Sequence, residues 1–243
     1  MDYLGSRSTV GKIKAARGNF AQSAKGIHAE NPGVTYRCPM GSSAQHWDDA
    51  YRQGDTTRGW YQPHASMSMK LLGSSAVPST SSIVDIGAGA STFVDGLLAA
   101  GFTDITLVDH SPVGLDIAQG RLGDASTHVR TIVADLRGWE PQRKYDVWHD
   151  RAVAHFLLDE ADQSRYRDTL LAATHPGSLV IIGLFGPDGP PMCAGLPVRR
   201  FTEADVATLL GDEFEIFSTE ISDHVRPDGD TQQYLWTLAQ RRR

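Results

Sequence analysis

The sequence predicts a doubly wound α/β domain, and three observations point to it. From residue 82 onward, short apolar runs alternate with segments of helical periodicity, which is the order that builds a mainly parallel sheet covered by helices. Glycines follow the first apolar run, where a strand has to turn tightly into a helix. The next two runs each lead into an aspartate. With 243 residues, the chain is long enough for one such domain.

The expected elements follow from local patterns. Strands are expected over the apolar runs 82–86, 105–108, 129–134, 145–149 and 178–184, and helices over 92–100, 112–122, 160–174 and 203–210. Ser111 before Pro112 is typical of a helix start, and so is Thr202 before Glu203. Two shorter helices are expected upstream, over 46–54 and from 64 to about 73.

The end of the chain is expected to add two strands, 214–221 and 234–239. They are close enough in sequence to pair as an antiparallel edge. The segment 186–201 is rich in glycine and proline, so it is expected to be a loop over the carboxyl end of the sheet.

Charged residues are distributed unequally along the chain. Residues 1–45 contain six Lys or Arg against Asp2 and Glu30, whereas the whole chain has a formal net charge of −6. We interpret 1–45 as a flexible or loosely helical extension and 46–243 as the domain; a transit-like segment or a nucleic-acid arm is the alternative for 1–45. The acidic domain argues against a nucleic-acid partner. No apolar run is long enough to cross a membrane, and no secretory signal is evident.

Two cysteines, Cys38 and Cys193, form neither a disulfide framework nor a zinc motif. This usage favours a cytoplasmic location, and no metal site is expected. The oligomeric state cannot be read from the sequence.

The chemistry of the sequence centres on the turn Asp85-Ile86-Gly87-Ala88-Gly89. Glycines let the backbone approach a ligand closely, and the helix that follows offers free N–H groups. Asp109 and Asp135 stand at the ends of the next two predicted strands. In a sheet of this kind ligands bind outside the carboxyl ends of the strands, where Asp109 suits ribose hydroxyls and Asp135 an exocyclic adenine amine.

A nicotinamide dinucleotide is the first alternative ligand. Its fingerprint requires a third small residue after the two glycines, and Thr92 stands at that position here. Asp85, two residues before Gly87, suits a ligand that carries its own amine. These features favour S-adenosylmethionine over a nicotinamide cofactor, although each aspartate alone is also typical of a helix cap or turn.

The segments DIGAGAS, VDHS, VADL and VWHDRAVAHFL resemble the successive motifs of class I S-adenosylmethionine-dependent methyltransferases. The segment HWDDAYRQG, followed by WYQP, resembles a bacterial subgroup related to protein-lysine methyltransferases. The resemblance implies a seven-stranded sheet with an antiparallel last strand, and S-adenosylhomocysteine as the product. The cofactor contacts it implies lie in these motifs: Asp85, Gly87, Ala88, Gly89, Asp109, His110, Asp135 and Leu136. Trp60 is a further candidate, for covering the cofactor; simple packing is its alternative role.

The fourth predicted strand leads into the candidate catalytic residues His149, Asp150, Arg151 and His155. An imidazole titrates near neutral pH and suits a general base, whereas an arginine suits an anionic acceptor group. An ion pair between Asp150 and Arg151 is the structural alternative. The expected acceptor is a small molecule with an oxygen, nitrogen or sulfur nucleophile, and a protein lysine is the alternative. A nicotinamide-dependent oxidoreductase and a non-catalytic nucleoside-binding module are alternatives of another class.

Overall fold

The computed structural model describes residues 43–242. The expected extension 1–45 lies almost entirely outside these residues, so its boundary at residue 46 stays a prediction. The first helix, α1 (Ser43–Arg52), begins before His46.

Seven strands form one sheet in the order β3-β2-β1-β4-β5-β9-β8. Strand β9 runs antiparallel to both of its neighbours, and the pairs among β1 to β5 are all parallel. This confirms the predicted doubly wound sheet with its antiparallel last strand. The strands are β1 (Ser82–Ile86), β2 (Asp104–Asp109), β3 (Val129–Val133), β4 (Tyr145–Arg151), β5 (Thr174–Phe185), β8 (Phe214–Val225) and β9 (Thr231–Arg241).

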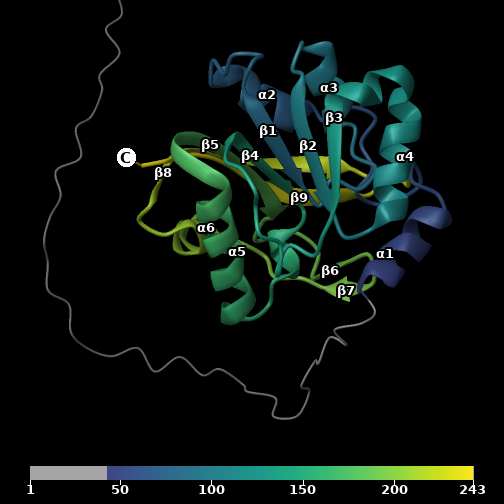
Figure 1. Cartoon of the computed structure of the whole chain (residues 1–243). Helices are drawn as coiled ribbons and strands as arrows, with labels where there is room; N and C mark the ends of the chain where they lie inside the picture. Colours follow the sequence, from purple (N-terminus) through teal and green to yellow (C-terminus); the bar gives the residue numbers. More distant parts are fainter. Residues whose placement is uncertain (1–42, 243) are drawn as a thin grey trace, which may run out of the picture. The chain divides into compact units, whose positions relative to one another are not determined.

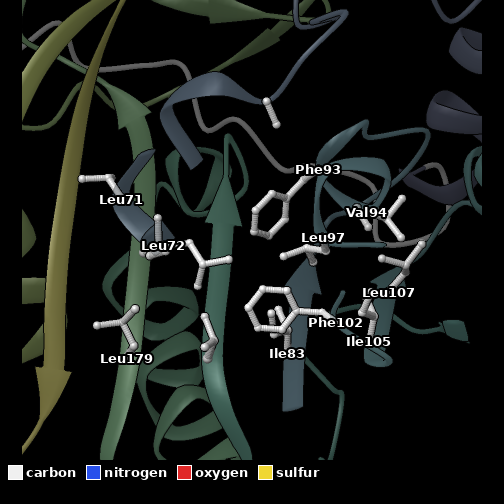
Figure 2. Packing of buried hydrophobic residues seen from close by; sticks show 14 of the residues in the cluster. Leu71, Leu72, Ile83, Phe93, Val94, Leu97, Phe102, Ile105, Leu107 and Leu179 are labelled. Atoms are coloured by element: carbon white, nitrogen blue, oxygen red, sulfur yellow. The ribbon is translucent and has the colours of Figure 1, made fainter. Parts of the chain in front are cut away.

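Helices cover both faces of the sheet (Figure 1). One face packs against α2 (Ser66–Ser74), α3 (Phe93–Ala99) and α4 (Pro112–Leu122). The other face packs against α5 (Glu160–Ala173) and α6 (Glu203–Leu210). Figure 2 shows the first core, where Phe93 and Leu97 of α3 lie near Leu71 and Leu72 of α2 above the strands.

Local signals explain where two of these helices begin. The Ser111 side chain accepts a hydrogen bond from the Gly114 N–H, and Pro112 occupies the first turn of α4. Thr202 and Asp205 form a reciprocal capping box at the start of α6. No helix of the described part of the chain is both long and apolar enough to cross a membrane.

The structure differs from expectation in three places. Strand β4 continues to Arg151, so the candidate catalytic segment begins within the strand. Strand β5 starts at Thr174 and takes in Pro176 and Gly177, which were expected to separate helix from strand. The segment 186–201 contains a small hairpin of β6 (Met192–Cys193) and β7 (Leu196–Pro197), which lies beside α1 (Figure 1).

Candidate active site

The glycine turn lies at the carboxyl end of β1. Gly87 and Gly89 have φ values of +60° and +46°, a conformation that L-residues with a side chain rarely adopt. A Cβ atom on Gly87 would lie 2.1 Å from Val153 Cγ2, and one on Gly89 would lie 1.8 Å from the Tyr51 hydroxyl oxygen. Glycine is therefore required at both positions by conformation and by close approach.

Asp109, the last residue of β2, is tied to this turn. Its carboxylate accepts a 2.9 Å hydrogen bond from the Gly89 N–H and a 2.7 Å bond from the Ser111 N–H. Burial raises the pKa of Asp109 to about 6, although these backbone donors oppose the rise; the nearby Asp85 charge adds to it. Asp85 and Asp109 thus lie close together at the ends of adjacent strands.

Asp85 belongs to a buried chain of three side chains. Its Oδ1 atom lies 2.6 Å from His149 Nδ1, and His149 Nε2 lies 2.8 Å from the Ser68 hydroxyl of α2. The Asp85 Oδ2 atom is buried and has no hydrogen-bond partner. Both ring nitrogens of His149 are engaged and the residue is only 1% exposed, so we interpret it as a positioning residue for Asp85.

Three further candidate residues follow the ends of β2 and β3: His110, Asp135 and Leu136. Arg137 forms an ion pair with Asp135 and holds the pKa of that carboxyl below its usual range. Burial lowers the pKa of His110, and the Asp135 charge acts on it in the opposite direction. Leu136 packs in the core beneath α5 and α6.

Helix α1 covers the glycine turn, and its residue Tyr51 lies within the electrostatic influence of Asp109. The Tyr51 ring lies against Gly89 and also against Gly114 of α4, where an added Cβ would come within 2.7 Å of it. Burial raises the Tyr51 pKa, and the Asp109 charge raises it further. Asp48, one turn earlier, accepts a 2.6 Å hydrogen bond from the Ser111 hydroxyl.

Trp47, on the same helix, joins an aromatic cluster. Its ring centroid lies 5.5 Å from that of Trp60, 5.3 Å from that of Phe156 and 6.4 Å from that of His110. Trp60 thus packs in this cluster, and its role in covering the cofactor stays a prediction. His46 Nε2 lies 3.0 Å from the Ala194 carbonyl oxygen, which joins α1 to the turn between β6 and β7.

Asp150 makes internal contacts. Its carboxylate accepts hydrogen bonds from the N–H groups of Val153 (3.0 Å) and Ala154 (3.2 Å), where it stabilises the turn η2 (Ala154–Phe156). Burial raises its pKa to about 6, against the effect of a hydrogen bond from Tyr166. No ion pair joins Asp150 to Arg151 in the described structure, which is contrary to the structural alternative above.

Arg151 and His155 lie on the side of the site towards β9. The Arg151 guanidinium donates a 2.9 Å hydrogen bond to the Trp60 carbonyl oxygen, and its central carbon lies 5.2 Å from the centre of the Tyr234 ring. His155 is fully buried between Phe156 and Phe185. Burial lowers its pKa to about 3, so the imidazole is neutral at neutral pH.

Comparison with known proteins agrees with this geometry. Residues 83–177 match the family model described as a methyltransferase domain. Over these residues the chain is similar to methyltransferase domains, and a solved S-adenosylmethionine-dependent methyltransferase from Methanosarcina mazei shares its fold at 16% identity. The matched segment begins in β1 and includes the glycine turn, Asp109, Asp135 and the end of β4.

A curated relative is similar to part of the chain. The malonyl-[acyl-carrier protein] O-methyltransferase 1 of Ilyobacter polytropus is 29% identical over 105 residues, which is 43% of this chain and 38% of that protein. The chain thus matches well under half of the length of this curated relative.

Solved structures share the fold at low sequence identity. A structure from work on the conversion of a disulfide bond into a thioacetal group during echinomycin biosynthesis has a TM-score of 0.66 at 18% identity, over 82% of this chain and 91% of that one. A methyltransferase from Anabaena variabilis gives 0.65 at 16% identity, over 82% and 93% of the two chains. The glycopeptide N-methyltransferase MtfA, solved with S-adenosyl-L-methionine, gives 0.56 at 12% identity, over 74% and 96%.

Three residues at the candidate site do not follow from the sequence analysis: Ser68, Trp47 and Tyr234. Trp47 and Tyr51 are four residues apart in α1, and this spacing could have indicated that they share one helix face. Ser68 and Tyr234 are brought in by tertiary packing of α2 and β9, and no local pattern marks them.

Proposed function

We propose that this chain binds S-adenosylmethionine at the glycine turn and transfers its methyl group to a small molecule. The observation that carries the proposal is the arrangement of Asp85, Asp109 and the two positive-φ glycines at the ends of adjacent strands. The match of residues 83–177 to a methyltransferase domain supports it over a nicotinamide-dependent enzyme.

The residues present fit this cofactor. The unpartnered Asp85 Oδ2 is a buried acceptor for the ammonium group, and the Asp109 carboxylate is an acceptor for ribose hydroxyls. His110 and Asp135 are the candidates for contacts to the adenine. A ligand lying on the turn would take over the contacts that Tyr51 and Val153 now make with Gly89 and Gly87. When bound, the cofactor supplies an electrophilic methyl group, so the protein has to orient the acceptor and exclude water.

A small acceptor is favoured over a protein lysine by the covered state of the site. Tyr51 and Trp47 of α1 lie over it, and His46 ties this helix to the turn between β6 and β7. A protein acceptor requires an open rim instead. The cytoplasmic location, expected from cysteine usage, stays a prediction.

Calorimetric titration tests the cofactor. S-adenosylmethionine and S-adenosylhomocysteine are each expected to bind, and Asp109→Ala is expected to weaken binding at least tenfold, which is about 1.4 kcal/mol. Asp104→Ala removes an acid that pairs with Arg143 at the other end of β2, so it is the matched control. Binding of NADH instead, or of none of these ligands by the folded chain, would overturn the proposal.

A screen with S-adenosyl[methyl-¹³C]methionine then tests the acceptor. Small-molecule and protein fractions of a cell extract are incubated separately with the chain, and labelled products are identified by mass spectrometry. Label in small molecules is expected. Label on lysine side chains alone would refute the small-molecule assignment.

A further inference from the structure

Arg151 is a cation without an acidic partner at the carboxyl end of β4. Its guanidinium donates to the Trp60 carbonyl oxygen and lies over the Tyr234 ring, but its Nε atom is buried and unpaired. Within residues 43–242 no carboxylate lies within ion-pairing distance of it. A partly buried charge that lacks a counter-ion is costly, so such a group commonly marks a place where an anion binds.

Two neighbouring side chains are also unsatisfied. The Tyr234 hydroxyl and both ring nitrogens of His155 are buried and have no hydrogen-bond partner. Burial raises the pKa of Tyr234 to about 12 and lowers that of His155; in both cases the nearby Arg151 charge makes the proton easier to lose. Buried polar groups in native proteins are nearly always paired, and here three lie within electrostatic reach of one cation.

The backbone is strained at the same place. Ala152, directly after Arg151, has a φ of +67° although it carries a side chain, and its N–H donates to the Gly183 carbonyl oxygen of β5. Strain of this kind gathers where a protein fixes the direction of a functional side chain. Here it fixes the chain at the base of the Arg151 side chain.

We propose that the methyl acceptor carries a carboxylate, which binds to Arg151 and accepts a hydrogen bond from the Tyr234 hydroxyl. This inference rests on the proposed function, since it names the substrate class of the same site. A guanidinium pairs with a carboxylate through two parallel hydrogen bonds. His155 is the third unpaired polar residue near Arg151, and its ring is neutral.

The charge balance favours a singly charged carboxylate over a phosphate. Arg226, whose charge acts on Cys193 and His224 together with that of Arg151, is paired with Asp228 and Asp230. His155 is neutral, and burial raises the pKa of the Cys193 thiol to about 12, so it also carries no charge. Arg151 therefore supplies one positive charge, which a carboxylate balances and a phosphate dianion exceeds.

Titration of the full chain with acetate, hexanoate and benzoate tests the proposal. Each acid is compared with its neutral amide and with inorganic phosphate, in the presence of saturating S-adenosylhomocysteine. The readout is the Nε–H resonance of Arg151 in ¹⁵N-arginine-labelled protein, which is assigned as the signal that Arg151→Lys removes. At least one carboxylate is expected to shift this resonance saturably, with an affinity at least tenfold above that of its amide.

Variants of Arg151 and Tyr234 test whether the carboxylate binds at these residues. Calorimetry of the acid that binds best is expected to show at least a tenfold loss in Arg151→Gln, partial recovery in Arg151→Lys and a severalfold loss in Tyr234→Phe. Arg143→Gln, at an arginine paired with Asp104, is the control and should bind like the wild type. Equal binding of acids and amides, a preference for phosphate, or an unchanged affinity in Arg151→Gln would each overturn the proposal.

The test also separates this inference from the proposed function. Each folded variant is first titrated with S-adenosylhomocysteine, which Arg151→Gln is expected to bind like the wild type. Absence of this binding in the wild type contradicts the proposed function. Carboxylate binding to Arg151 is then measured without the nucleoside, and this measurement tests the Arg151 proposal independently of cofactor binding.

Discussion

Cofactor affinity should depend on the ionisation of Asp109. Its pKa is about 6 because it is buried, and only the ionised carboxylate can accept hydrogen bonds with all of its lone pairs. If only the ionised form binds, the apparent dissociation constant rises by a factor of one plus ten to the power of pKa minus pH. This factor is about 1 at pH 7.5 and about 11 at pH 5, so the affinity falls about tenfold on acidification, or about 1.4 kcal/mol.

The assay is calorimetric titration with S-adenosylhomocysteine between pH 5 and pH 7.5. Near-ultraviolet circular dichroism at each pH checks that the chain stays folded. Asp109→Asn removes the titrating group, so its affinity should be lower and nearly flat across this range. Asp104→Asn is the matched control, because Asp104 lies in the same strand and pairs with Arg143 at the surface. A wild-type affinity that does not change with pH, or a fall of equal size in Asp109→Asn, would show that Asp109 ionisation does not control cofactor binding.

Three further predictions concern stability, each measured by urea unfolding. Gly87→Ala should lower the free energy of unfolding by about 1–3 kcal/mol, because φ at Gly87 is positive and the new Cβ atom would meet Val153. Gly138→Ala is the control and should change the stability little, because the space around Gly138 is open. Equal losses of stability in the two variants would contradict the close approach of Val153 to Gly87. Ser68→Ala should lower the free energy of unfolding by about 1–3 kcal/mol, because it leaves the buried His149 Nε2 without a hydrogen-bond partner. Ser74→Ala, at an exposed position of the same helix, should lower it far less. Similar losses in the two variants would argue against the buried hydrogen bonds that join Asp85, His149 and Ser68. His155 has a depressed pKa in the folded state, so its contribution is complete above about pH 6.5 and is lost as the pH falls towards 3. Between pH 7 and pH 5, His155→Leu should therefore lose about 2 kcal/mol less stability than the wild type, and parallel losses would show that His155 is not held neutral.

The sequence was sufficient for the fold because its signals are local. Apolar runs gave the strands, and Ser111 with Pro112 marked the start of α4. The apolar run alone predicts β4 only as far as His149, because Asp150 and Arg151 are polar residues that a pattern of apolar runs does not include. The β6–β7 hairpin was missed for a similar reason, since a pairing of two residues per strand leaves no periodicity.

The candidate site could be predicted only in part. Glycines and strand-end aspartates have fixed places relative to the strands, so their meeting at one edge follows from the topology. The roles of His149 and Arg151 depend on partners distant in sequence. Ser68 is a hydrogen-bond partner of His149, whereas Arg151 lies over the Tyr234 ring and has no acidic residue beside it within the described part of the chain. Residue type alone does not distinguish a positioning imidazole from a general base.

A crystal structure of the chain with S-adenosylhomocysteine tests directly whether the cofactor binds at the glycine turn. We expect the ribose hydroxyls to lie within hydrogen-bond distance of the Asp109 carboxylate. We also expect the ligand's ammonium group to lie at Asp85 Oδ2 and the Tyr51 ring to have moved away from Gly89. A ligand bound elsewhere on the sheet, with Tyr51 still against Gly89 and the Asp85 oxygen still unpaired, would contradict this expectation.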